Sequence, residues 1–352
     1  MLILFYTFYA LTLKSVRVNI YSKEKTMKKS IKKIVAICLA VLIVAGLFAA
    51  CSGQQGKNNY TVGICQWVEH PALDEATKGF IQALKDKIGE ENVTIDPQNA
   101  QEDSGNCTTI INQFVSKNVD LIMANATPSL QTAVSATNQI PIVATSITEY
   151  GVALNKTLNN GKTGINVTGT SDLPPLDQQA AMIKEILPDV KSVGIVYCSR
   201  EDNSAYQVEE VTKYLEADGV KVTAYSFAES TELQAITQKA VSENDALYIP
   251  TDNAAAKATD IIDAVARPAK CPVFAGEEGI CKGCGIVTLS IKYYDIGYKA
   301  GEMAAEILLN EKNPAEMEIA YAPEFTKKYN PEICKDLGIT APEGYVAVDA
   351  AE

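Results

Sequence analysis

Short, continuous apolar runs alternate with amphipathic segments from residue 60 onward. We expect strands at 60–66, 93–97, 120–125, 141–147, 163–168, 192–197, 221–227, 246–250, 271–275 and 285–290. Most are rich in Val and Ile, as is typical of strands buried on both faces of a parallel sheet. In the segment after the first run, Leu73, Ala76, Phe80, Leu84 and Ile88 recur at helical spacing. The alternation predicts an α/β fold with doubly wound parallel sheets.

The chain also contains an internal repeat. "TVGICQ" at Thr61 is similar to "SVGIVY" at Ser192, and "PIVATS" at Pro141 is similar to "PVFAGE" at Pro272. A third pair, at Asp120 and Asp245, keeps nearly the same spacing of 125–131 residues. Two copies of one α/β unit predict two lobes, whose strand ends can face each other across a cleft.

The first 50 of the 352 residues do not read as part of the fold. Residues 27–50 have a lysine-rich start, an apolar run and small residues before Cys51, which is the pattern of a secretory signal. The ending "LFAAC" is typical of a lipobox, although Phe48 stands where Leu is usual, so we expect Cys51 to be lipidated. We interpret residues 1–26 as an extension before the true start at Met27. An uncleaved signal anchor is the alternative, and either places the remaining chain outside the cytoplasmic membrane.

Charge and cysteine content narrow the function further. Residues 1–50 hold eight Lys and Arg and one Glu, so the rest has 23 basic and 42 acidic residues, a net charge of −19. Nucleic acid repels such a chain. Residues 51–59 read as the lipidated Cys with a polar tether. Seven further cysteines, several in apolar runs, do not form the pattern of a disulfide scaffold.

Polar side chains gather where the predicted strands end, next to helix starts. Ligands of open α/β sheets bind at such ends. The candidate ligand-binding residues are Gln66, Glu69, His70, Asn125, Thr127, Ser146, Ile147, Thr170, Ser171, Asp172, Tyr197, Asn203, Ser204, Thr251, Asp252, Asn253, Glu277 and Tyr293. Hydroxyls and amides suit a carboxylate, and we select Asn125, Thr127 and Ser146 for carboxylate or other polar contacts. Acids suit an ammonium, and the candidates are Asp172, Asp252 and Glu277.

Several of these residues have a plain structural interpretation as well. Asp172, Asn203, Asp252 and Asn253 are good N-cap residues, so capping alone explains an Asp or Asn before a helix. Tyr293 either stacks on an aromatic ligand or packs a helix. Trp67, the only tryptophan, either contacts the ligand, covers the cleft or faces a partner.

The sequence contains few motifs that would indicate an enzyme, a metal site or a cofactor site. Glu69 and His70, the only histidine, could form an acid–base pair, but no nucleophile elbow accompanies them. The CxxC at Cys281 and Cys284 lacks two further zinc ligands and does not lie in a thioredoxin-like unit. No glycine-rich loop matches a nucleotide fingerprint, and no helix-turn-helix precedes the α/β part. We expect no catalytic residue, no metal, no cofactor and no nucleic-acid partner.

At this point the chain resembles the substrate-binding lipoproteins of ABC importers, in particular the tryptophan- and tyrosine-uptake family. The resemblance covers residues 51–352 nearly in full and is carried by "EHPALDEATKGF", "NVTGTSDL", "NSAYQVEE", "YIPTDNA", "PVFAGEEG" and "YYDIGYKAGEMAAEIL". It implies the type I periplasmic-binding-protein fold: two Rossmann-like lobes, three crossovers and hinge closure. We place the crossovers near 166–169, 290–292 and 320–323. Lobe one is then 60–166 with 291–321, and lobe two is 167–290 with 322–352.

The resemblance also implies a function. It predicts a lipid-anchored, extracytoplasmic, monomeric protein that binds a small solute, an aromatic or apolar amino acid, and delivers it to an ABC permease. Lys292, Glu149-Tyr150 and Cys198-Ser199 depart from the family pattern near the cleft, which leaves the ligand open. The alternatives are the same fold binding a sugar, nucleoside or signal molecule for a sensor receptor, and a secreted enzyme.

Overall fold

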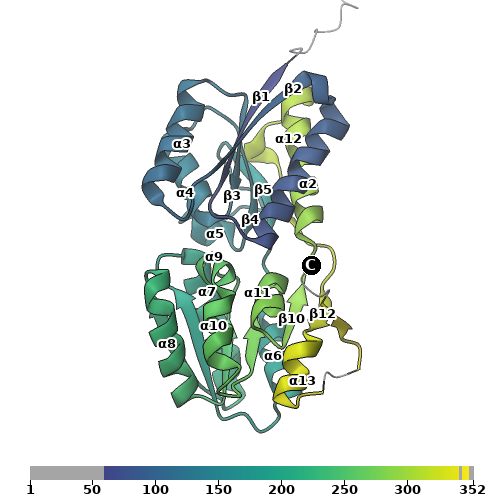
Figure 1. The fold of residues 1–352 in the computed structure, drawn as a ribbon. Helices are drawn as coiled ribbons and strands as arrows, with labels where there is room; N and C mark the ends of the chain where they lie inside the picture. The colour runs from purple at the N-terminus through teal and green to yellow at the C-terminus, as the bar shows by residue number, and fades with distance from the viewer. Residues whose placement is uncertain (1–58, 341–342, 349–352) are drawn as a thin grey trace, which may run out of the picture. The chain divides into compact units, whose positions relative to one another are not determined.

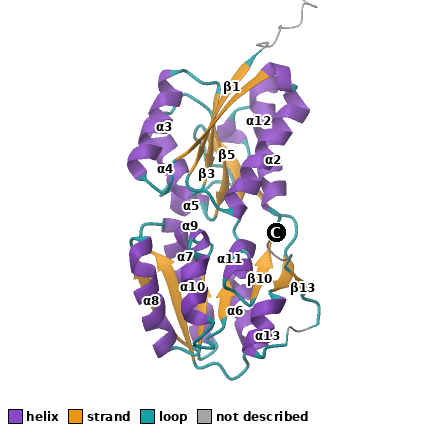
Figure 2. Cartoon of the chain, viewed as in Figure 1, coloured by secondary structure: helices purple, strands orange, loops and turns teal. Residues whose placement is uncertain are grey.

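The computed structural model describes residues 59–340 and 343–348 of the chain (Figure 1). The predicted signal, Cys51 and nearly all of the tether lie outside these residues. The described residues form one compact unit with its own hydrophobic cores. It contains two sheets, each flanked by helices (Figure 2). The predicted α/β architecture with two lobes is therefore confirmed.

The sheet of the first lobe has six strands in the order β11-β5-β4-β3-β1-β2, and all of its pairings are parallel. The strands are β1 (Tyr60–Gln66), β2 (Val93–Asn99), β3 (Leu121–Asn125), β4 (Ile142–Ile147), β5 (Val167–Ser171) and β11 (Ala320–Tyr321). Its helices are α2 (Pro71–Ile88), α3 (Ser104–Ser116), α4 (Thr127–Ala136), α5 (Tyr150–Ala153) and α12 (Tyr293–Asn310), with 3-10 turns η1 (Glu90–Asn92) and η2 (Pro314–Glu316).

The sheet of the second lobe has seven strands in the order β13-β12-β10-β9-β8-β6-β7, and only the β10–β12 pairing is antiparallel. The strands are β6 (Ser192–Cys198), β7 (Lys221–Phe227), β8 (Ala246–Ile249), β9 (Val273–Ala275), β10 (Val287–Ser290), β12 (Thr326–Tyr329) and β13 (Val346–Ala347). Its helices are α6 (Leu176–Ile186), α7 (Asp202–Ala217), α8 (Ser230–Glu243), α9 (Asn253–Lys257), α10 (Thr259–Ala266), α11 (Glu278–Gly283) and α13 (Pro331–Leu337).

Each central strand is buried on both faces, which explains why its sequence is a continuous apolar run. In β3, Leu121 and Met123 face the core beneath α2 and α12, while Ile122 and Ala124 face the core beneath α3 and α4 (Figure 1). This alternation is the two-residue period of a strand. The same pattern in β8 divides its residues between the two cores of the second lobe.

The fifth strand differs from our expectation. We placed it at 163–168, across the expected boundary between the lobes at 166, whereas β5 spans Val167–Ser171 and pairs with β4 in the first sheet. Residues before it form a turn: Gly164 has φ +68°, and the Thr163 hydroxyl donates to the carbonyl of Val167 at 2.6 Å. The first crossover therefore follows Ser171.

Candidate functional site

The carboxyl ends of the first lobe's strands lie side by side. Gln66 at the end of β1 is in register with Asn125 at the end of β3, and Asn125 is in register with Thr145 of β4. Ile147 is next to Ser171 of β5. Polar residues that are far apart in the sequence therefore meet at one edge of the sheet, as the rule for parallel sheets requires.

Gln66 and Asn125 hold the start of helix α2 on this edge. The Gln66 amide donates to Asp74 at 2.7 Å and accepts from the Thr77 hydroxyl at 2.6 Å. The Asn125 amino group donates to the carbonyl of Leu73 at 2.8 Å and to Thr77 at 2.9 Å. The Asn125 side-chain oxygen is buried and has no protein partner. Both polar atoms of the Gln66 side chain are therefore hydrogen-bonded within the protein, whereas Asn125 Oδ1 is left as an acceptor without a protein partner.

The end of β4 is irregular. Its register with β5 shifts between Ala144 and Ile147, and Ser146 has φ +57°. A β-bulge of this kind redirects a side chain at a strand end. The Ser146 hydroxyl is buried without a protein partner, while the neighbouring hydroxyls of Thr170 and Ser171 donate to Thr145 and to the carbonyl of Thr148.

Asp172, directly after β5, is a buried carboxylate with one oxygen engaged. Oδ2 accepts from the Tyr293 hydroxyl at 3.0 Å, and Oδ1 has no protein partner. Burial raises the pKa of Asp172 to about 6, with the hydrogen bond from Tyr293 acting in the opposite direction. An approaching cation would favour the ionised form.

The other two acidic candidates cap helices. Asp252 accepts from the main-chain N–H groups of Ala255 at 2.8 Å and Cys198 at 2.7 Å. Glu277 accepts from the N–H groups of Gly279 and Ile280 at the start of α11. Burial raises the pKa of Glu277 to about 7. Of the three proposed ammonium partners, only Asp172 keeps an unpartnered oxygen.

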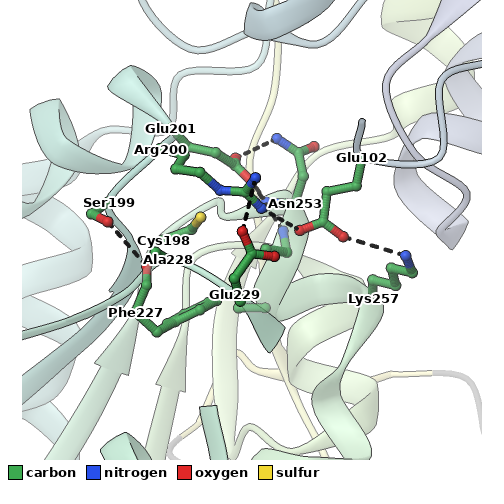
Figure 3. A network of polar contacts seen from close by, with 12 residues as sticks. Glu102, Cys198, Ser199, Arg200, Glu201, Phe227, Ala228, Glu229, Asn253 and Lys257 are labelled. Atoms are coloured by element: carbon green, nitrogen blue, oxygen red, sulfur yellow. Dashed lines mark hydrogen bonds and ion pairs between the residues drawn. The ribbon is translucent and has the colours of Figure 1, made fainter. Parts of the chain in front are cut away.

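A polar network in the second lobe surrounds Glu201 (Figure 3). Its carboxylate accepts from the main-chain and side-chain nitrogens of Asn253 at 3.0 and 2.6 Å and from the main-chain N–H of Ala254 at 3.0 Å. The Asn203 amide donates to it at 3.2 Å and to the carbonyl of Thr251 at 3.0 Å. Burial raises the pKa of Glu201 to about 8, and these N–H donors oppose that rise.

Residues of the two lobes meet through polar contacts. His70 Nε2 lies 3.2 Å from Asn253 Oδ1. Glu102 of the first lobe lies 3.6 Å from Arg200 and 3.3 Å from Lys257 of the second (Figure 3). Sequence reasoning missed this charged group, because its members come from three separate loops and helices.

Six buried polar atoms near the strand ends have no protein hydrogen-bond partner, out of seven such side-chain atoms in residues 59–340 and 343–348. They are Trp67 Nε1, His70 Nδ1, Asn125 Oδ1, Ser146 Oγ, Asp172 Oδ1 and Asn203 Oδ1. A buried polar group without a partner costs about 1–3 kcal/mol, so native proteins seldom leave several together. We call this set the six-atom cluster, and it identifies the candidate ligand site.

Two grooves are present, and Trp67 is the residue of the six-atom cluster that lines the first of them. One has a volume of about 530 Å³ and is lined by Trp67, Glu102, Gln131, Arg200 and Glu201 among others. The other has a volume of about 380 Å³ and is lined by Ala72, Glu277, Tyr293 and Tyr294 among others.

Other predicted site residues have structural surroundings that do not point to a ligand. Glu69 is exposed, Ile147 is fully buried in the first core, and Tyr197 packs against a core of the second lobe. Ser204 is buried in the first turn of α7, whereas Thr127 begins α4 two residues after Asn125 and stays a candidate for ligand contact. Sequence reasoning left Trp67 undecided, and the structure places its indole N–H in the six-atom cluster.

The cysteines within the described part of the chain form no disulfide. All seven cysteines there are free and buried. Burial raises the pKa of Cys281 and Cys284 well above its ordinary value, which keeps both thiols protonated. Across those same residues, no group of three or more potential ligands could hold a metal ion.

The fold and the strand-end site define a two-lobed solute-binding protein, and comparison with known proteins identifies its family. Residues 61–352 match the family described as ABC transporter substrate binding protein, and the chain belongs to that family. Members bind solutes and are not enzymes. The family is extracytoplasmic, binds small molecules such as amino acids and interacts with ABC permeases. Among the described residues, no helix combines the length and apolar character needed to cross a membrane.

Individual relatives agree with this assignment. The chain is 37% identical over 292 residues to the tyrosine-binding protein of Clostridioides difficile, covering 79% of this chain and 84% of that protein. A Streptococcus pneumoniae ABC domain solved in complex with L-Trp is 31% identical, with a TM-score of 0.78 over 82% of this chain and 100% of that one. A ligand-free, open substrate-binding protein of Clostridium difficile with adhesive properties is 36% identical, with a TM-score of 0.64 over 83% and 100%.

Proposed function

We propose that this protein binds an aromatic amino acid between its two lobes and delivers it to the permease of an ABC importer. The observation that carries the proposal is the six-atom cluster of unpartnered polar atoms at facing strand ends. Four of its atoms come from the first lobe, Asp172 Oδ1 comes from the crossover after β5, and Asn203 Oδ1 comes from the second lobe. A ligand that contacts both lobes stabilises the closed form, which is the form a permease would recognise.

The cluster suits the two charged groups of an amino acid. Asp172 Oδ1 and Asn125 Oδ1 are acceptors for an ammonium, and the ionised Asp172 supplies its counter-charge. Helix α4 begins after Ala126 without a side-chain cap, and its first turn carries buried Thr127 and Ser129. N–H groups at such a helix start favour a carboxylate.

The arrangement of the lobes supports closure around a ligand. The structure has a higher TM-score to the L-Trp complex (0.78, 31% identity) than to the ligand-free open relative (0.64, 36% identity). Sequence similarity alone would favour the opposite order. The contacts His70–Asn253 and Glu102–Lys257 are those expected to form when the lobes approach.

Aromatic side chains and the relatives favour an aromatic ligand. Trp67 and Tyr293 are buried beside the strand ends, and both present a polar atom there. Such rings can stack on an aromatic ligand. The relatives named above are a tyrosine-binding protein and a complex with L-Trp. We further propose a monomer held at the membrane by a lipid on Cys51, which the signal sequence and "LFAAC" support.

Calorimetric titration of residues 52–352 with the twenty amino acids tests the proposed function. We expect saturable binding of tyrosine, tryptophan or phenylalanine at one site per chain, because the site offers one ammonium partner. Sugars and nucleosides serve as the control panel, and they should give no heat. Binding of a sugar with no binding of any aromatic amino acid would overturn the proposal.

A further inference from the structure

His70 is the chain's only histidine, and the structure holds it between the lobes. It precedes helix α2 in the loop after β1, and it is 7% exposed. One ring nitrogen, Nε2, lies 3.2 Å from Asn253 Oδ1 on the second lobe. The other, Nδ1, is buried with no protein partner. The two nitrogens therefore face different surroundings.

Glu201 fixes the orientation of the Asn253 amide. Its Oε2 accepts from Asn253 Nδ2 at 2.6 Å and from Asn253 N at 3.0 Å, and its Oε1 accepts from Ala254 N at 3.0 Å (Figure 3). Main-chain N–H groups can only donate, so both oxygens of Glu201 are held as acceptors. With Glu201 in the ionised form that these donors favour, Asn253 presents its amino group to Glu201 and its carbonyl oxygen to His70.

This orientation determines where the hydrogen on His70 sits. A carbonyl oxygen accepts but cannot donate, so the contact with Asn253 requires a hydrogen on Nε2. Burial lowers the pKa of His70, which favours the neutral ring. A neutral imidazole with its hydrogen on Nε2 has a bare lone pair on Nδ1. His70 Nδ1 is thus a buried hydrogen-bond acceptor on the first lobe. Asn253 of the second lobe keeps it an acceptor by holding the ring hydrogen on Nε2.

We propose that His70 determines ligand specificity by accepting, at Nδ1, a hydrogen bond from an O–H or N–H group of the ligand. This inference rests on the proposed function, since an amino acid carries an ammonium and tyrosine also carries a phenol. A ligand that placed a carboxylate or an ether oxygen there would leave two acceptors facing each other, which disfavours binding. Because Asn253 sets the tautomer from the opposite lobe, the acceptor is fixed only when the lobes are together.

Nitrogen NMR of the ring tests the tautomer directly. A ¹⁵N-labelled chain made without a polyhistidine tag has a single imidazole, so the two ring signals need no assignment by mutation. With the aromatic amino acid bound, we expect a hydrogen on Nε2 and none on Nδ1, unchanged between about pH 5 and pH 8. Asn253→Ala should introduce the second tautomer or the charged ring. A hydrogen on Nδ1 in the wild-type complex would overturn the proposal.

Affinities of ligand analogues identify the donor. His70→Phe should weaken tyrosine binding by about 10- to 100-fold, the effect of losing one buried hydrogen bond. If the phenol is the donor, the variant and wild type bind phenylalanine alike; if the ammonium is the donor, they bind 3-(4-hydroxyphenyl)propionate alike. Gln82→Ala, an exposed change on helix α2, is the control and should match wild type. Equal affinity of His70→Phe and wild type for all three compounds would contradict the role of His70. Failure of wild type to bind tyrosine, phenylalanine or tryptophan would instead refute the proposed function.

Discussion

Replacing Asp172 with asparagine should weaken binding of the proposed amino acid by about 30-fold or more. Asp172 Oδ1 is a buried acceptor without a protein partner, and its carboxylate is the one acidic candidate not engaged in helix capping. Truncating one side of a buried charge pair costs about 2–5 kcal/mol, and the lower end of this range corresponds to about a 30-fold loss of affinity. The substituted side chain would keep an amide oxygen for the Tyr293 hydroxyl, so the fold should be preserved. Calorimetry measures the affinity, and thermal unfolding checks the fold.

The pH dependence provides an internal control for the same carboxylate. Burial raises the pKa of Asp172 to about 6 in the protein without ligand, and an ammonium binds only the ionised form. Affinity should therefore fall as the pH drops below about 6, by up to tenfold per pH unit, and the Asp172→Asn variant should lack this fall. Asp177→Asn, an exposed change nearby, should behave like wild type in both respects. An Asp172→Asn variant with wild-type affinity would show that this carboxylate does not hold the ligand.

Gly297→Ala should lower the free energy of unfolding by about 3 kcal/mol. A Cβ at Gly297 would lie 2.0 Å from the main-chain oxygen of Ala76, and one at Gly79 would lie 2.1 Å from that of Tyr294. Helices α2 and α12 therefore touch through their backbones, and a methyl group would force them apart. Helix propensity alone would make Gly→Ala stabilising by about 1 kcal/mol. A loss of stability would therefore show that the close contact between the helices outweighs helix propensity. Chemical denaturation measures the change.

The control for this substitution is another glycine in a helix. At Gly105, in the first turn of α3, the nearest atom to an added Cβ is Asp103 Oδ1 at 3.1 Å, the end of a movable side chain. Gly105→Ala should change stability by less than about 1 kcal/mol. Because Tyr293 begins α12 and donates to Asp172, Gly297→Ala should also weaken ligand binding. Unchanged stability in Gly297→Ala would mean that the two helices can separate at little cost.

Sequence patterns predicted the parts of the fold that depend on local chemistry. Apolar runs located the central strands because both faces of each sheet are covered, as the alternation in β3 shows. The start of the fifth strand was harder to predict, since Thr163 and Gly164 have strand-like neighbours but form a turn. The short strands β11, β12 and β13 carry no long apolar run, and sequence reasoning did not find them.

The sequence predicted where the residues of the candidate site lie better than it predicted what each of them does. The strand-end rule selected Asn125, Ser146 and Asp172, which retain unpartnered atoms, together with Asp252 and Glu277, which cap helices. In the sequence, an acid that caps a helix looks the same as an acid that keeps a free oxygen for a ligand. The difference lies in which N–H groups reach the carboxylate in three dimensions. Contacts such as His70–Asn253 join residues 183 positions apart, and no local pattern marks them.

A crystal structure of the chain with its aromatic amino acid bound tests the central claim most directly. The account predicts the ligand between the two lobes, with its ammonium within about 3 Å of Asp172 Oδ1 and with hydrogen bonds to other atoms of the six-atom cluster. A ligand located elsewhere, or one between the lobes whose ammonium contacts none of these atoms, would contradict it.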